Sequence, residues 1–143
     1  VTRRVELERV QFHGDESEED IELVDYPVIK AVRGADREAA ELYPGSLLLL
    51  DHPTQGGGQG QAWNWTEAAE LIHEGYDLIL AGGLTPENVG AALEQLGEAL
   101  PWGVDVATGV EIDGEVRKDP KRMIAFVEAV RSTDGPEHHE TDD

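Results

Sequence analysis

The sequence contains no cysteine and only three lysines among its 143 residues. Without cysteine, the chain has no disulfide, no thiolate metal ligand and no thiol nucleophile. It shows no signal peptide and no hydrophobic run long enough to span a membrane, so we expect a cytoplasmic protein without membrane contacts. The formal net charge of −20, from 11 basic and 31 acidic residues, argues against nucleic acid as a partner, because nucleic-acid binding requires basic patches.

The acidic surplus also bears on the habitat and on the domain boundary. Acidic surfaces of this strength are typical of proteins adapted to high salt, where counter-ions screen self-repulsion, so we expect a halophilic source. A hydrophobic content of 39%, gathered in sharp runs, excludes a chain disordered throughout. We therefore expect one domain over residues 1–131, followed at 132–143 by an acidic disordered tail whose two adjacent histidines are solvated rather than bound to metal.

The hydrophobic runs alternate with helical patterns, and no hairpin signal separates them. Strands are predicted at residues 8–12, 27–32, 47–50, 76–81 and 103–107, and helices at 15–24, 37–42, 66–75, 89–100 and 120–130. Five consecutive strand–helix units indicate a parallel sheet, either doubly wound or part of a (β/α)8 barrel. The last two strands each end in a glycine-bearing turn. Because phosphate sites after the seventh and eighth strands are frequent in barrels, these turns favour the barrel.

Asp51 is the main candidate for chemistry, since it ends the buried strand of four leucines, Leu47 to Leu50. α/β folds place their active sites at the carboxyl ends of such strands, although an exposed residue that starts a turn is an equally good interpretation. The glycine-rich loop at 55–60 that follows can approach a ligand through its backbone. It lacks the lysine of a nucleotide-binding P-loop, so it is weak evidence for a nucleotide.

Further polar residues lie at or near the ends of other predicted strands. Gln11 and His13 share one face of the first strand. A histidine near a strand end is more often hydrogen-bonded within the protein than in contact with a ligand. Lys30, inside an apolar strand, is as often a paired structural residue as a ligand contact. Gly82 and Gly83 lie between a strand and a helix whose start is marked by Thr85 and Pro86. Free amides and the helix dipole converge there, which makes an anion site.

Several short motifs together cover nearly all of residues 9–130. They are Val10-Gln11-Phe12-His13-Gly14-Asp15-Glu16, Ile29-Lys30-Ala31, Leu50-Asp51, Gly57-Gly58-Gln59-Gly60 with Trp63-Asn64-Trp65, Ala81-Gly82-Gly83-Leu84-Thr85-Pro86-Glu87-Asn88-Val89, Val104-Asp105-Val106-Ala107-Thr108-Gly109-Val110-Glu111 and Lys118-Asp119. In these motifs and in their order, the sequence resembles the phosphoribosylanthranilate isomerase family of tryptophan biosynthesis.

The resemblance implies a (β/α)8 TIM barrel of which this chain supplies strands four to eight, with strands one to three missing. It implies a cofactor-free Amadori rearrangement, from an N-linked phosphoribosyl aminoaldose to a ketose, on a phosphorylated small-molecule substrate. Asp51 matches the family's general acid, and Asp105 matches a carboxylate that contacts a substrate hydroxyl. Gln11 and His13 match residues that line the pocket. The phosphate-binding positions are Gly82, Gly83, Thr108 and Gly109, and no metal site is implied.

The resemblance also assigns the general base to a cysteine, which this sequence lacks. We therefore expect little or no isomerase activity from the chain alone, and a homo-oligomer or a complementing N-terminal segment as a partner. Two alternatives follow. One is a non-catalytic, phosphosugar-binding half-barrel remnant that pairs with another chain. The other is a different phosphosugar barrel enzyme, which the Gln-Phe-His-Gly and glycine-loop motifs disfavour.

Overall fold

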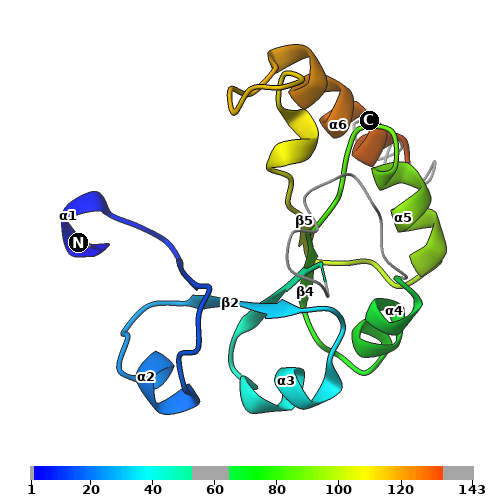
Figure 1. Cartoon of the computed structure of the whole chain (residues 1–143). Coiled ribbons are helices and arrows are strands. Elements are labelled where there is room, and N and C mark those ends of the chain that lie inside the picture. The colour runs from blue at the N-terminus through cyan, green and yellow to red at the C-terminus, as the bar shows by residue number, and fades with distance from the viewer. Residues whose placement is uncertain (1, 53–64, 134–143) are drawn as a thin grey trace, which may run out of the picture.

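The structure, a computed structural model, describes residues 2–52 and 65–133. Strands and helices alternate along the chain (Figure 1). The strands are β1 (Val10–Phe12), β2 (Val28–Arg33), β3 (Leu47–Asp51), β4 (Leu78–Leu80) and β5 (Gly103–Val104). The helices are α1 (Thr2–Val5), α2 (Glu18–Glu22), α3 (Arg37–Leu42), α4 (Thr66–His73), α5 (Val89–Leu96) and α6 (Pro120–Ser132), with a 3-10 turn, η1 (Thr108–Val110), after β5.

All five strands are parallel and form one sheet in the order β1-β2-β3-β4-β5. Neighbours in sequence are neighbours in the sheet, as short strand–helix–strand connections require. The predicted fold class, a (β/α)8 barrel with strands four to eight present and one to three missing, is wrong. Within the described residues β1 and β5 are the two edges of an open sheet, and no hydrogen bonds join them. The architecture is therefore a five-stranded parallel α/β sheet.

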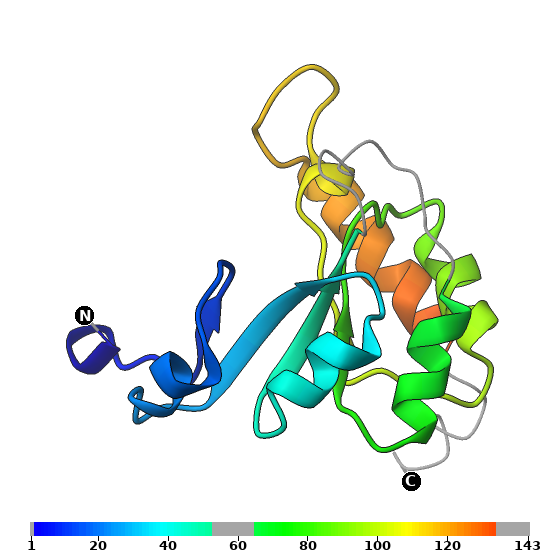
Figure 2. The same ribbon diagram turned by 60° about the horizontal axis from the view of Figure 1, so that its bottom comes forward.

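The two faces of the sheet are covered differently. Figures 1 and 2 show α3, α4, α5 and α6 on one side of the sheet. The larger core lies on that side and joins alternate strand residues to residues of the helices. It includes Val32, Leu48, Leu50, Leu78 and Leu80 from the strands and Trp65, Leu71, Val89, Leu96 and Phe126 from the helical layer. Alternation along β3 and β4 sends Leu47, Leu49, Ile79 and Ala81 to the other face, where they form a second, smaller cluster.

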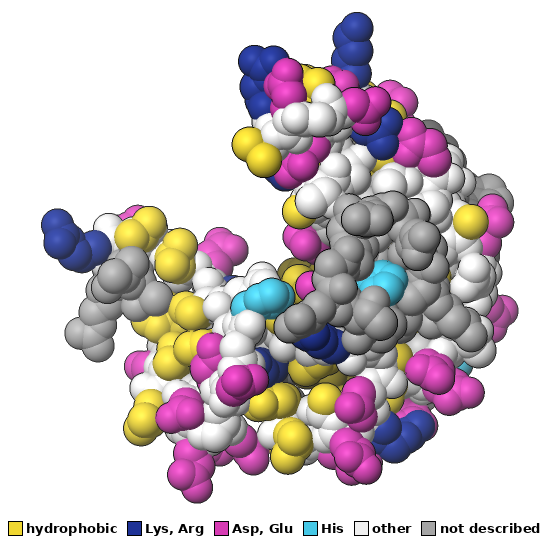
Figure 3. Space-filling view, viewed as in Figure 1, with side chains coloured by type: hydrophobic (Ala, Val, Ile, Leu, Met, Phe, Trp, Pro, Cys, Tyr) yellow, Lys and Arg dark blue, Asp and Glu magenta, His cyan; other side chains and the backbone are white. Residues whose placement is uncertain are grey.

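This second face is concave. The space-filling view shows a broad hollow between the N-terminal segment and the part of the chain around η1, with acidic side chains scattered over the visible surface (Figure 3). A parallel sheet carries its ligands at the carboxyl ends of its strands, so the predicted site residues should meet at one rim of this hollow.

Most elements lie where the sequence predicts them, but several are shorter. The helix predicted at 37–42 is found unchanged as α3, because Asp36 caps it by accepting hydrogen bonds from the amides of Glu38 and Ala39. The strand predicted at 103–107 ends at Val104, although the amide of Asp105 still donates to the carbonyl of Leu80 at 2.8 Å. The tail predicted at 132–143 overlaps the last residue of α6, Ser132, and its residues 134–143 lie outside the described part of the chain.

Candidate active site

A pocket of about 680 Å³ lies at the carboxyl ends of the strands. Its lining includes Gln11 and His13 after or within β1, Asp51 at the end of β3, Gly82 and Gly83 after β4, and Asp105 and Thr108 after β5. Seven of the eight residues predicted for the site thus line one pocket. Gly109, the eighth, lies next to Thr108 in η1.

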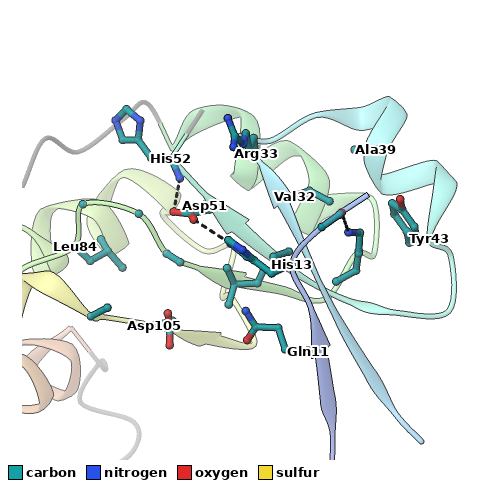
Figure 4. A pocket seen from close by; sticks show the side chains of 18 of the residues that line it. Gln11, His13, Val32, Arg33, Ala39, Tyr43, Asp51, His52, Leu84 and Asp105 are labelled. Carbon is teal, nitrogen blue, oxygen red and sulfur yellow. Dashed lines mark hydrogen bonds and ion pairs between the residues drawn. The ribbon is translucent and has the colours of Figure 1, made fainter. Parts of the chain in front are cut away.

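Asp51 occupies the centre of this pocket (Figure 4). Its Oδ1 accepts a hydrogen bond of 2.7 Å from the amide of His52, while its Oδ2 lies 3.6 Å from Nε2 of His13. The backbone oxygen of Asp51 accepts a bond from the amide of Gly34, which holds the strand end in place. Because Oδ1 is already bonded, Oδ2 is the oxygen that Asp51 presents to His13 and the pocket.

Asp105 faces the same space from β5, and Gln11 approaches it from β1 (Figure 4). Asp105 is exposed to solvent, yet the surrounding protein removes part of the water from its carboxyl group. Desolvation therefore raises the pKa of Asp105 above its ordinary value of 3.8, and the nearby Asp51 carboxylate raises it further. An acid whose pKa is raised by burial and by a neighbouring carboxylate, in a pocket, is typical of functional sites.

The loop after β4 depends on two glycines in the left-handed backbone conformation. Gly82 and Gly83 have φ angles of +79° and +74°, a conformation that favours glycine. A Cβ on Gly82 would lie 2.2 Å from the amide nitrogen of His52, so only glycine lets this loop pack against the end of β3. The side-chain amide of Asn88 donates to the carbonyl of Gly83 at 2.8 Å, and its Oδ1 accepts from the amide of Thr85 at 2.7 Å.

Thr85, the predicted cap of the following helix, closes a separate turn just before that helix begins. Thr85 Oγ1 accepts hydrogen bonds from the amides of Glu87 and Asn88, and Asn88 returns the bond to Thr85. This reciprocal arrangement closes the turn at 85–88, and α5 begins directly after it at Val89. The Gly82-Gly83 turn is therefore held rigidly at the start of a helix.

The turn after β5 packs against this loop. A Cβ on Gly109 would lie 1.9 Å from the carbonyl oxygen of Leu84, so the two glycine turns are in direct contact. Thr108 and Gly83 line the same pocket. The fold thus brings together the four residues predicted to bind phosphate, from two loops that the sequence separates.

Lys30 is a paired residue of the interior. Its side chain is 3% exposed, and Nζ donates to the carbonyl of Gly14 at 2.5 Å and to Glu16 at 3.0 Å. It also lies 5.3 Å from the ring centre of Tyr43, whose hydroxyl donates to the carbonyl of Glu16. These contacts fix residues 14–16, immediately after His13, and so hold the loop that carries His13 to Asp51.

Other pocket residues were missed from sequence. Arg33 and His52 line the pocket beside Asp51, one at the end of β2 and one just after β3. Their position at strand ends is the signal that could have identified them, because in-register pairing sets Arg33 opposite Asp51. The glycine loop at 55–60 and Trp63-Asn64 lie outside the described residues.

Two further searches covered only the residues that the structure describes. Within 2–52 and 65–133, no group of three or more histidine, aspartate or glutamate side chains is placed to hold a metal ion. Within the same ranges, no helix is both long and apolar enough to cross a bilayer.

The order of these motifs and the pocket that they form can be compared with known proteins. The family model described as N-(5'phosphoribosyl)anthranilate (PRA) isomerase matches residues 1–129. The chain belongs to this family. The family resemblance inferred from the ordered motifs is thereby confirmed.

Members of the PRA isomerase family resemble the chain over most of its length. The N-(5'-phosphoribosyl)anthranilate isomerase of Moorella thermoacetica is 43% identical over 139 residues, which cover 93% of this chain and 59% of that enzyme. The isomerase of Pseudomonas fluorescens is 45% identical over 140 residues, 92% of this chain and 63% of that enzyme. The chain therefore spans about three fifths of the length of these curated relatives.

The likeness extends to three dimensions. The crystal structure of phosphoribosyl anthranilate isomerase from Thermotoga maritima superposes with a TM-score of 0.79 at 32% identity. The superposition covers 92% of this chain and 65% of the T. maritima chain. The five-stranded parallel sheet and its helices are thus arranged as in the matching part of that structure.

Proposed function

We propose that this chain carries the general acid and the phosphate-binding part of a PRA isomerase active site, which acts in tryptophan biosynthesis. The observation that supports this most is the position of Asp51. It stands between His13 and the two contacting glycine turns, in a pocket at the carboxyl ends of the strands. A proton donor beside an anion site is what the rearrangement of a phosphosugar requires.

The proposed first step is opening of the furanose ring. Protonated Asp51 gives its proton to the ring oxygen of N-(5'-phosphoribosyl)anthranilate, the C1'–O bond breaks, and the nitrogen lone pair forms a C1'=N iminium. Loss of the C2' proton to a base gives an enolamine, which tautomerises to the 1-deoxyribulose 5-phosphate product. Every atom of the substrate is kept, so no external oxidant, reductant or cofactor takes part.

The other predicted site residues have binding roles in this proposal. The amides around Gly82, Gly83, Thr108 and Gly109 hold the 5'-phosphate, assisted by the dipole at the start of α5. Asp105 accepts a hydrogen bond from a ribose hydroxyl, while Gln11 and His13 contact the substrate from β1. The phosphate at one end of the pocket then fixes the ring oxygen near Asp51.

The family's general base is a cysteine, and this sequence contains no cysteine that could take that role. We expect product binding and a low rate of turnover from the chain alone. Turnover at the usual rate of an enzyme, about 1–1,000 per second, would contradict this part of the proposal. Membership of the PRA isomerase family argues against a remnant that has no connection with catalysis.

The test compares Asp51→Asn with wild type. Disappearance of N-(5'-phosphoribosyl)anthranilate is followed at high enzyme concentration, and product binding is measured by calorimetry. We expect turnover to fall about 100-fold or more, because general acid catalysis contributes about that much, while product affinity stays within about threefold. Asp77→Asn is the control, since Asp77 precedes β4 at the amino end of the sheet. Equal turnover by Asp51→Asn and wild type would contradict the assignment.

Association with a further polypeptide and a high-salt habitat are also part of this proposal. Leu23, Val116 and Ile124 are 85%, 87% and 60% exposed, which leaves apolar surface for a partner or a second copy to cover. A net charge of −20 opposes self-association at low salt. Sedimentation velocity should show larger species as salt is raised, and a monomer at every salt concentration would contradict association of copies.

A further inference from the structure

Two cations bind backbone carbonyls of the turn after β5. Arg122, in the first turns of α6, donates from Nε and Nη2 to the carbonyl of Gly109 at 3.1 and 2.9 Å. Lys118 donates to the carbonyl of Ala107 at 2.9 Å and pairs with Glu111. Neither Arg122 nor Lys118 lines the pocket.

Holding these carbonyls also sets the direction of backbone amides. A trans peptide is planar, and its N–H points opposite to its C=O. The carbonyl of Ala107 shares a peptide plane with the amide of Thr108, and the carbonyl of Gly109 shares one with the amide of Val110. Cations that bind both carbonyls therefore turn both amides away from themselves.

Arg122 also reaches the other glycine loop. Its Nη1 and Nη2 donate to the two carboxylate oxygens of Glu87 at 2.9 and 3.0 Å. Glu87 belongs to the turn between Gly83 and α5, and this bidentate bond lowers the pKa of its carboxyl group. We call the pair Glu87 and Arg122 the loop clamp. It ties the loop after β4 to the turn after β5 through one guanidinium group.

The two loops that the loop clamp joins are packed tightly against each other at Gly109 and Leu84. Gly109 lies so close to the carbonyl of Leu84 that a methyl group would overlap it. A small shift of one loop therefore changes the distance between the amides of the two loops. Anion binding by backbone amides depends on that distance, because every amide must reach the same phosphate.

We propose that Glu87 and Arg122 are positioning residues for the phosphate site, and that the loop clamp sets the spacing of its two glycine turns. The inference deepens the proposed function and rests on it, since the ligand is the 5'-phosphate of the same substrate. Glu87 and Arg122 act through the backbone of other residues and do not touch the ligand.

Replacing Glu87 distinguishes positioning from simple charge. Glu87→Ala removes a negative charge near an anion site, so electrostatics alone would strengthen phosphate binding. Loss of positioning would weaken it, because Arg122 then holds only one of the two loops. The two explanations therefore predict opposite signs for the same variant.

The experiment titrates the chain with the ketose 5-phosphate product by calorimetry, at one high and fixed salt concentration. Wild type, Glu87→Ala and Arg122→Gln are compared. The matched controls are Glu94→Ala, an exposed acid near the end of α5, and Arg117→Gln, which removes an arginine paired only with Glu115 within the described residues. We expect Glu87→Ala and Arg122→Gln to bind about tenfold more weakly and the controls to stay within about twofold of wild type.

A second measurement keeps the test valid where Arg122→Gln folds poorly. Amide NMR of ligand-free Glu87→Ala should show displaced Thr108 and Val110 signals while those of β2 and β3 stay in place. Product binding by Glu87→Ala as tight as wild type, or tighter, overturns the loop clamp and leaves the proposed function standing. Absence of product binding by wild type itself overturns both.

Discussion

Nε2 of His13 and Oδ2 of Asp51 lie 3.6 Å apart although β2 separates their strands in the sheet. Adjacent strands lie about 4.8 Å apart, so residues two strands away on a flat sheet would be about 10 Å apart. The short distance results from the curvature of the sheet and from the reach of two side chains into its concave face. The geometry of the site thus depends on the bend of the sheet as much as on the residues themselves.

The first prediction concerns His13. His13→Ala should weaken product binding about fivefold, because it removes a polar side chain that faces Asp51 and the pocket. Calorimetry on the purified chain measures the affinity. His73→Ala, in the last turn of α4 on the helical side, serves as the control. Unchanged affinity in His13→Ala would place the substrate away from β1.

The second prediction concerns Gly109. Gly109→Ala should lower the free energy of unfolding by about 1–3 kcal/mol, because the new methyl group overlaps the backbone carbonyl of Leu84. It should also abolish product binding, since relief of the overlap separates the two glycine turns. Gly45→Ala is the matched control, as a Cβ there meets nothing within 4 Å. Urea unfolding of both variants gives the comparison, and equal stability would contradict the tight contact.

The third prediction concerns the buried cation Lys30. Lys30→Met should lower the free energy of unfolding, because Glu16 loses its cationic partner and the carbonyl of Gly14 loses its donor. The double variant Lys30→Met with Glu16→Gln should recover part of this loss, since no partly buried charge then stays unpaired. Urea unfolding measures both. A double variant no more stable than Lys30→Met would show that packing, and not charge pairing, sets the cost.

The fourth prediction follows from the raised pKa of Asp105. The folded protein holds this proton more tightly than the unfolded chain does, so ionisation of Asp105 costs stability as the pH rises from about 3.8 through the higher folded pKa. Asp105→Asn should therefore be more stable than wild type at pH 7. The difference in stability should vanish below pH 3.8, where Asp105 is protonated in both the folded and the unfolded chain.

Urea unfolding at pH 3 and pH 7 in high salt checks this prediction. Asp25→Asn is the control, because it removes an exposed acid between α2 and β2, away from the pocket. A wild type that is more stable than Asp105→Asn at pH 7 would mean that Asp105 gains a partner in the fold.

The sequence predicted local structure well where one short-range signal decides it. Leu47 to Leu50 form a buried strand, because four consecutive leucines place apolar side chains on both faces of the sheet and both faces must then be covered. Asp36 and Thr85 mark helix starts through contacts within three residues. The glycine turns at Gly82 and Thr108 are also short-range features that the sequence predicts, whereas their contact with each other depends on the fold.

What could not be predicted depends on residues distant in sequence. Whether the sheet closes is decided by its edge strands β1 and β5, and periodicity within a strand carries no information about that. Glu87 and Arg122 are 35 residues apart, and each resembles an ordinary exposed charge of a helix or turn. The role of Lys30 was left open because its partner Glu16 lies in a different strand–helix unit.

The most direct test of the account is a calorimetric titration of the wild-type chain with the ketose 5-phosphate product, with and without inorganic phosphate. We expect one molecule of product per pocket and competition by phosphate, because the proposal assigns the phosphate group to the glycine turns at Gly82-Gly83 and Thr108-Gly109. The product lacking its phosphate should bind about 100-fold more weakly. Equal binding of the two compounds, or no binding of the phosphorylated one, would contradict the assignment of this pocket to a PRA isomerase active site.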